Sequence, residues 1–242
     1  MTNVVFIHAF PLDASMWEAE VAELLGEATA LAPHLPGFGG THLPPDILSV
    51  EVMADHVAAE MDRNGIARAV ICGCSLGGYA AFEMWRRHRD RVAGLCLVDT
   101  RAEADDDAGR ERRRQVAELV RERGSEAIAE DPPPLLSGDA PEALRASIRE
   151  TIRAQPAEAI ARASLGMGAR PDSTPILGQI SVPTTVIVGS ADTLTPPPLS
   201  EAMARAIPGA ELAVLEGAGH LSNLEEPGGF LDALRGLLAR VG

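Results

Sequence analysis

Short apolar runs alternate along the chain with longer segments whose apolar residues recur at helical spacing. Most of the short runs are apolar throughout, which is typical of strands buried on both faces of a parallel sheet. They predict strands at residues 4–8, 28–32, 69–74, 94–98, 184–188 and 210–215. The segments between them predict helices, among others at residues 49–64, 76–88, 199–206 and 227–240. This alternation predicts a doubly wound α/β fold.

The alternation stops after Asp99 and resumes at Ile180. The interval is rich in Arg, Glu and Ala, has no strand pattern and predicts a helical insertion. Three consecutive prolines at residues 132–134 predict an extended connector between its helices, with a gate over a functional site as the alternative. We therefore predict an α/β core at residues 1–100 and 179–242 and a helical cap insertion at residues 101–178.

An acidic run at residues 105–107 stands near the start of this insertion. Acidic residues directly before a helix favour its N-terminus or a solvated surface, and metal binding is the weaker alternative. Four histidines lack the paired spacing that is typical of metal ligands: His34, His42, His56 and His88. We therefore predict no metal site.

Composition and charge narrow the class of protein. The 242-residue chain is 46% hydrophobic, enough for one large core. Its net charge of -14 disfavours nucleic acid and anionic membranes as partners, because both would repel the surface, and favours a neutral substrate. The three cysteines are expected to be reduced core residues, since Cys72 and Cys74 lie on opposite faces of a strand. A strand is predicted close to Met1 and no apolar run reaches transmembrane length, so we expect a cytoplasmic protein without a signal peptide.

The most informative chemical pattern is Gly73-Cys74-Ser75-Leu76-Gly77, which lies between a predicted strand and a predicted helix. A glycine two positions away on each side of the serine is what a sharp strand-to-helix turn requires. Such a turn exposes the serine hydroxyl and forms a nucleophile elbow. A glycine-rich packing turn is the alternative, and the pattern alone does not decide between the two.

Two later loops supply the partners that a nucleophilic serine needs. Asp192 and His220 each follow a predicted strand, at the carboxyl ends where open α/β sheets bind their ligands. A serine hydroxyl is a poor nucleophile at neutral pH and requires a base such as imidazole. We predict that His220 takes the proton of Ser75 and later donates it to the leaving group, while Asp192 orients the ring. Asp99, which ends another predicted strand, is the alternative acid.

An acyl-transfer site also needs hydrogen-bond donors for the developing oxyanion. We predict that the backbone N–H groups of Leu76, at the start of the elbow helix, and Phe10, in the loop after the first strand, form this oxyanion hole; Pro11 has no N–H to donate. His8, Phe10 and Leu76 are expected to line the substrate pocket. For His8, holding the loop by hydrogen bonds is favoured over a direct role in the chemistry.

Further motifs accompany these residues at positions 8–11 (His-Ala-Phe-Pro), 15–17 (Ser-Met-Trp), 35–39 (Leu-Pro-Gly-Phe-Gly) and 219–220 (Gly-His). With the elbow and Asp192, they resemble the α/β-hydrolase superfamily, and within it small cofactor-free carboxylesterases and enol-lactonases with a helical cap. The resemblance implies an α/β-hydrolase fold with a mostly parallel sheet of about eight strands, an active site beneath the cap and no cofactor. One departure is Ala9, where relatives commonly carry glycine; its methyl group is expected to narrow the oxyanion loop.

The expected activity is hydrolysis of a small to medium neutral carboxylic ester or lactone through an acyl-enzyme. Perhydrolysis of the cofactor-free haloperoxidase type, C–C bond hydrolysis and hydroxynitrile cleavage are alternatives on the same triad. Haloalkane dehalogenase chemistry is disfavoured, because it would require aspartate in place of Ser75. An alternative of another class is a ligand-binding receptor or partner protein that uses the hydrolase fold. We expect a small-molecule substrate, no nucleic-acid or membrane partner, and a monomer or homodimer.

Overall fold

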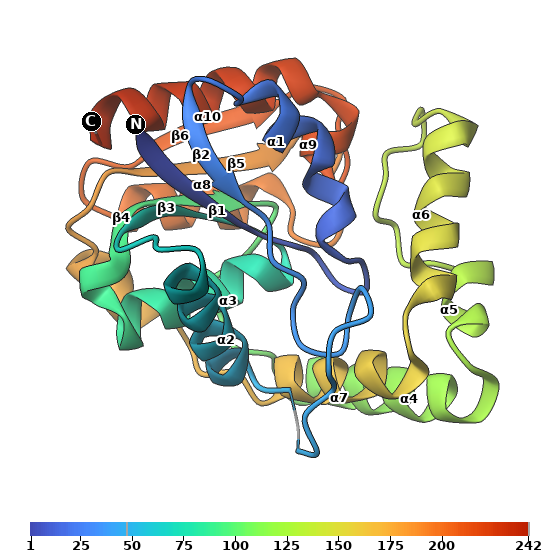
Figure 1. Cartoon of the computed structure of the whole chain (residues 1–242). Coiled ribbons are helices and arrows are strands. Elements are labelled where there is room, and N and C mark those ends of the chain that lie inside the picture. Colours follow the sequence, from blue (N-terminus) through green and yellow to red (C-terminus); the bar gives the residue numbers. More distant parts are fainter. Residues whose placement is uncertain (47, 242) are drawn as a thin grey trace.

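One parallel sheet forms the centre of the protein, whose computed structural model describes residues 1–46 and 48–241. Within these residues, every neighbouring pair of strands is parallel. Along the sheet the strands are ordered β2 (Ala28–Leu31), β1 (Thr2–Ile7), β3 (Ala69–Cys74), β4 (Val92–Val98), β5 (Thr184–Gly189) and β6 (Glu211–Leu215). Figure 1 shows helices on both faces of the sheet, so the predicted α/β class is confirmed.

The predicted number of strands is wrong, since the described part of the chain forms six strands and not about eight. All six runs identified from the sequence form strands whose ends lie within two residues of the predicted ones. The higher number came only from the resemblance to relatives. The long interval between β4 and β5, where further strands would have had room, forms helices instead.

Burial along the strands follows their place in the sheet. β3 and β5, in the interior, are buried at every residue, which is why their sequences are apolar or small throughout. β2 and β6, at the two edges, carry exposed or partly exposed residues.

The order of the strands determines where their loops lie. Because β3, β4, β5 and β6 are neighbours in a parallel sheet, their carboxyl ends lie side by side, and the loops that follow them lie at one edge of the sheet.

Helices of the core cover both faces of the sheet. α1 (Glu18–Glu23) and α10 (Pro227–Val241) lie on one face, and α2 (Val50–Arg63) and α3 (Leu76–Arg87) lie on the other (Figure 1). α8 (Pro197–Ala206) packs against β5 and β6, and the short α9 (Ser222–Glu225) directly precedes α10. Short 3-10 turns lie in the core at η1 (Ala14–Trp17) and η2 (Arg89–Arg91), and a third, η3 (Thr174–Gln179), lies at the end of the insertion.

The interval between β4 and β5 is helical, as predicted. It contains α4 (Asp107–Arg123), α5 (Glu126–Glu130), α6 (Glu142–Ala154) and α7 (Ala157–Gly168). α4 packs along α7, and α5 packs against α6. In Figure 1 these helices lie apart from the two helical layers that cover the sheet. The segment between α5 and α6, which contains the three prolines, has no helix or strand and is called the connector (residues 131–141) below.

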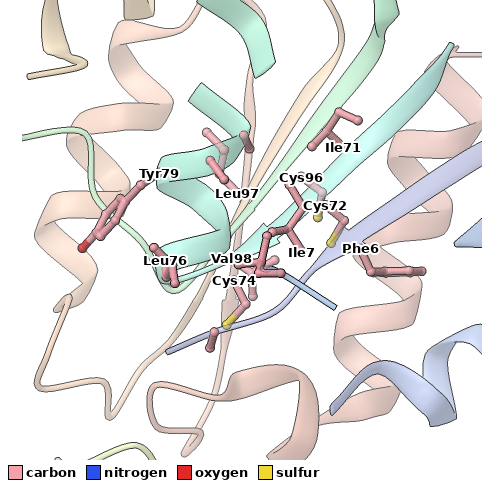
Figure 2. Close-up of a cluster of buried hydrophobic side chains, with 14 of the residues drawn as sticks. Phe6, Ile7, Ile71, Cys72, Cys74, Leu76, Tyr79, Cys96, Leu97 and Val98 are labelled. Atoms are coloured by element: carbon pink, nitrogen blue, oxygen red, sulfur yellow. The ribbon is translucent and has the colours of Figure 1, made fainter. Parts of the chain in front are cut away.

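Aromatic and sulfur-containing side chains fill the core next to the sheet. The Trp17 ring lies 4.9 Å from that of Phe6 and 5.6 Å from that of Phe230, which ties η1 to β1 and α10. The three cysteines are free, buried thiols, as expected, and Figure 2 shows them among the apolar side chains of β1, β3 and β4.

Across the described ranges, no helix is long and apolar enough to cross a bilayer.

Candidate active site

Ser75 occupies a strained turn between β3 and α3. Its φ and ψ angles are 53° and -110°, so φ lies in the left-handed region that non-glycine residues seldom adopt. Two hydrogen bonds hold this backbone: the Ser75 N–H donates to the Val98 carbonyl at 2.9 Å, and the Thr100 hydroxyl donates to the Ser75 carbonyl at 2.8 Å. The Ser75 side chain is partly exposed while Cys74 and Leu76 on either side are buried. The turn therefore presents one hydroxyl to a ligand.

The glycines of the pattern are required by close backbone contacts. A Cβ atom at Gly73 would lie 2.1 Å from the Gly77 carbonyl oxygen, and one at Gly77 would lie 2.2 Å from the Ile7 carbonyl oxygen. Both distances are far below van der Waals contact, and both partners are backbone atoms that cannot rotate away. The elbow thus lies directly against the end of β1, where the predicted oxyanion loop begins.

His220 joins Ser75 to Asp192 in one chain of hydrogen bonds. The Ser75 Oγ lies 2.8 Å from His220 Nε2, and His220 Nδ1 lies 2.8 Å from Asp192 Oδ2. Because the carboxylate accepts, Nδ1 carries the ring proton, and Nε2 is left as the acceptor for the serine proton. Both His220 and Asp192 are almost completely buried. The structure brings together the three residues predicted as the triad.

Asp192 is held as a carboxylate by donors on both oxygens. Oδ1 accepts from the N–H groups of Leu194 and Thr195, at 2.8 and 3.0 Å. Oδ2 accepts from His220 and from the Thr195 hydroxyl, the latter at 2.7 Å. Burial by itself raises the pKa of Asp192, but the hydrogen bonds from His220 and Thr195 outweigh burial and hold it below its usual value.

The two predicted oxyanion donors lie at segments that the elbow brings into contact. Leu76 is the first residue of α3, so its N–H has no partner within the helix. Phe10 follows β1, whose last residue Ile7 touches the elbow at Gly77. In the residues that the structure describes, neither amide donates to another backbone carbonyl outside regular secondary structure. Leu76 is fully buried, and the role of the two N–H groups as an oxyanion hole stays a prediction.

His8 is engaged entirely with the backbone. Its side chain is fully buried; Nε2 accepts from the Leu35 N–H at 3.0 Å, and Nδ1 donates to the Ala9 carbonyl at 3.0 Å. Burial lowers the pKa of His8 to about 4, so the ring is neutral near pH 7. With both nitrogens occupied, this geometry favours the loop-holding role and leaves no polar atom of the ring for a substrate.

Asp99, the alternative acid, contacts other groups. It directly follows β4, has a φ of 44° and is fully buried. Its Oδ1 accepts from the Gly189 N–H at 2.9 Å, and its Oδ2 accepts from the N–H and hydroxyl of Ser222, at 2.9 and 2.6 Å. Burial raises the pKa of Asp99 to about 7, although nearby His220 and Ser222 oppose the shift. Asp99 therefore connects the backbone just before Asp192, at Gly189, to the backbone just after His220, at Ser222. The carboxylate that contacts the imidazole is that of Asp192.

The acidic run of the insertion has structural partners. Asp105 forms ion pairs with Arg113 and Arg170, at 3.1 and 2.9 Å, and also pairs with Arg101. Asp106 caps α4 by accepting from the Gly109 N–H at 2.6 Å. Over residues 1–46 and 48–241, no group of three or more His, Cys, Asp or Glu side chains has an arrangement suited to a metal ion. The run is thus used to start a helix and to bind arginines.

A pocket of about 360 Å³ lies beside the triad and does not include Ser75. The connector and α6 form most of its wall, and Ala191 and Thr193, the neighbours of Asp192, complete it. This pocket lies between the connector and the loop that carries Asp192. The residues predicted to line the substrate pocket, His8, Phe10 and Leu76, do not line it.

Two residues that contact the candidate triad or its backbone were not identified from the sequence. Thr195 donates to Asp192 and lies 3.3 Å from His220 Nδ1, and Glu225 binds the backbone next to His220. Thr195 stands just before Pro196, so the loop after Asp192 carried a turn signal that could have drawn attention to it. Glu225 lies on a helix of only four residues and had no such signal.

Comparison with known proteins identifies the family. A profile of the alpha/beta hydrolase family matches residues 4–233, and the chain belongs to that family. It is accordingly a hydrolase of the α/β fold, and the predicted resemblance to small esterases and enol-lactonases is confirmed.

Three relatives illustrate the similarity. The solved structure of a thermophilic esterase from Thermogutta terrifontis, bound to malate, is 42% identical, with a TM-score of 0.95 over 100% of this chain and 90% of its own. The enol-lactonase from Burkholderia xenovorans LB400 is 29% identical, with a TM-score of 0.90 over 98% of this chain and 91% of its own. The 3-oxoadipate enol-lactonase 2 of Acinetobacter baylyi is 26% identical over 250 residues, which cover 98% of this chain and 88% of that protein.

Proposed function

We propose that this protein hydrolyses small to medium neutral carboxylic esters or lactones through an acyl-enzyme on Ser75. The observation that carries the proposal is the unbroken chain of hydrogen bonds from Ser75 through His220 to Asp192, with 2.8 Å at each of the two steps. The names of the relatives, esterase and enol-lactonase, support an ester bond as the bond that is cleaved.

Acylation begins when Ser75 Oγ attacks the substrate carbonyl carbon while its proton passes to His220 Nε2. Asp192 stabilises the imidazolium that forms, and its hydrogen bond keeps the ring in the required tautomer. The N–H groups of Phe10 and Leu76 donate to the carbonyl oxygen as it becomes an oxyanion. When the tetrahedral intermediate collapses, the ester C–O bond breaks and His220 gives its proton to the leaving oxygen.

Deacylation repeats these steps with water as the nucleophile. His220 takes a proton from the water, whose oxygen attacks the acyl carbon, and the bond between that carbon and Ser75 Oγ then breaks. The proton returns from His220 to Ser75, and the acid is released. With a lactone, the leaving oxygen stays attached to the acyl group, so a single hydroxy acid is the product.

In this proposal residues 101–178 act as a cap over the active site, and residues 1–100 and 179–242 form the catalytic core. Support comes from a direct contact between the two: the Leu221 N–H, next to His220, donates to the Leu135 carbonyl of the connector at 2.9 Å. A cap in this position limits water at the reacting centre and determines which acyl groups fit.

Hydrolysis of p-nitrophenyl acetate, p-nitrophenyl butyrate and a small lactone tests the proposal. Ser75→Ala and His220→Ala are each expected to lower kcat by about three decades or more, and the double variant no further, because members of a triad act as a unit. Ser147→Ala, an exposed serine on α6, is the matched control and should retain full activity. Wild-type rates in Ser75→Ala would contradict the assignment of the nucleophile.

A further inference from the structure

The loop that carries His220 is bound to the connector on both sides of the histidine. On one side, the Leu221 N–H donates to the Leu135 carbonyl at 2.9 Å. On the other, the Gly219 N–H donates at 2.8 Å to the carboxylate of Glu225, which itself binds the connector. His220 therefore sits between two anchoring points, and the second depends on a single side chain.

The Glu225 carboxylate is surrounded by donors from two distant segments. Its Oε1 accepts from the N–H groups of Gly219 and Ser137, at 2.8 and 3.0 Å. Its Oε2 accepts from the Ser137 hydroxyl at 2.5 Å and lies 3.2 Å from the Ser137 N–H. Two N–H groups and one O–H group require a partner that only accepts, and an ionised carboxylate meets that requirement.

Close packing shows the same association independently of these hydrogen bonds. A Cβ atom at Gly219 would lie 2.4 Å from the Ser137 nitrogen and 2.6 Å from the Leu136 carbonyl carbon. The connector backbone thus rests directly on the residue before His220. Arg145 of α6 holds the other side of the connector by donating to the Ser137 carbonyl at 2.5 Å and the Gly138 carbonyl at 3.0 Å.

We infer that Glu225 is a positioning residue for His220, and that through it the helical insertion helps to hold the catalytic base against Ser75. Asp192 fixes the tautomer and orientation of the imidazole ring, whereas the backbone at residues 219–221 fixes the position of the ring relative to Ser75. Glu225 and Ser137 bind that backbone to the connector. The inference rests on the proposed function, since it assumes that His220 activates Ser75.

Loss of the Glu225 carboxylate should affect the reaction step more than binding. A displacement of about 1 Å between base and nucleophile lowers the rate by roughly 100-fold. Glu225→Ala removes every acceptor at once and is expected to show a loss of about this size. Glu225→Gln keeps one acceptor oxygen but turns an amide N–H₂ group toward a donor, so a loss between wild type and Glu225→Ala is expected. Ser137→Ala removes only the hydroxyl and should show the smallest loss.

The rate at which a small alkyl fluorophosphonate labels Ser75 tests the inference, because labelling needs the base but no particular ester substrate. Varying the probe concentration separates the maximal rate, kinact, from the half-saturating concentration, KI. We expect kinact to fall in the order wild type, Ser137→Ala, Glu225→Gln, Glu225→Ala, with KI changing less than threefold. Glu27→Ala, which removes a surface carboxylate paired with Arg235, is the control and should label like wild type.

Several results would overturn the inference. Equal kinact in wild type and Glu225→Ala would do so. A Glu225→Ala variant in which only KI rises, with kinact unchanged, would do so too. If Glu225→Ala does not fold, as judged by thermal unfolding, a wild-type kinact in both Glu225→Gln and Ser137→Ala would overturn it as well. Absence of labelling in the wild type would instead overturn the proposed function and, with it, the inference.

Discussion

Substitution of Asp192 by asparagine tests how the catalytic base is oriented. Oδ1 of Asp192 accepts from two backbone N–H groups, those of Leu194 and Thr195, while Oδ2 faces His220 Nδ1 and the Thr195 hydroxyl. An asparagine must put its oxygen on one of these sides and its N–H₂ group on the other. The donors around the side chain therefore decide which way the amide points.

The energies favour the orientation that inactivates the enzyme. With the N–H₂ group on the Oδ1 side, two backbone N–H groups would lose their acceptor at about 1–3 kcal/mol each, or about 2–6 kcal/mol together. The oxygen therefore stays there, and the N–H₂ group donates to His220 Nδ1. The ring proton then moves to Nε2, which no longer accepts a proton from Ser75. Such a change of tautomer lowers kcat by about 10⁴-fold, equivalent to about 5.5 kcal/mol of activation free energy.

Steady-state hydrolysis of p-nitrophenyl acetate by wild type and Asp192→Asn, with thermal unfolding of both, measures this effect. We expect kcat to fall by about four decades while the variant remains folded. Asp99→Asn is the comparison, because Asp99 makes no hydrogen bond to His220 and should cost far less activity. Retention of more than a tenth of the wild-type kcat in Asp192→Asn, alongside a collapse of activity in Asp99→Asn, would refute the reasoning and make Asp99 the acid.

Three further substitutions probe the parts that support the triad. Gly77→Ala must separate the elbow from the Ile7 carbonyl, which a Cβ atom would approach to 2.2 Å, so a lower Tm and a roughly 100-fold loss of kcat are expected; unchanged kinetics would contradict the close contact. Trp17→Ala should lower the free energy of unfolding by about 3–5 kcal/mol in urea titrations, because the ring is fully buried between two others. His8→Gln tests the buried neutral imidazole. In wild type, His8 takes up a proton near pH 6.5 in the unfolded chain but only near pH 4 in the folded protein. The free energy of unfolding therefore falls by about 3 kcal/mol as the pH drops from about 6.5 to about 4. The variant should lack this part of the decline, and parallel curves for the two proteins would show that His8 is not the group responsible.

The strands, and the meeting of Ser75, Asp192 and His220, were accessible to sequence analysis because local patterns specify them. A strand buried on both faces must be apolar throughout, as β3 and β5 are, and such runs are visible in the sequence. The glycines around Ser75 were equally visible in the sequence. A Cβ atom at Gly73 or Gly77 would lie only 2.1 or 2.2 Å from a backbone oxygen, so no side chain fits at either position. Asp192 and His220 followed from their place after strands, because the carboxyl ends of parallel strands meet at one edge.

The contacts that hold the triad in place were not accessible in the same way. Glu225 meets Ser137 across 88 positions of sequence, and Asp99 meets Ser222 across 123. No periodicity links such residues, and a single glutamate or serine in a loop is compatible with many partners. The number of strands was wrong for a different reason: it came from relatives, whereas the described residues of this chain form six strands.

The most direct test of the account is the site of covalent labelling by a fluorophosphonate. The purified wild-type protein is treated with the probe, its intact mass is measured, and the labelled peptide is sequenced by mass spectrometry. We expect one adduct per chain, on Ser75, and no adduct in Ser75→Ala. An adduct on another residue, or equal labelling of Ser75→Ala, would contradict the assignment of Ser75 as the nucleophile.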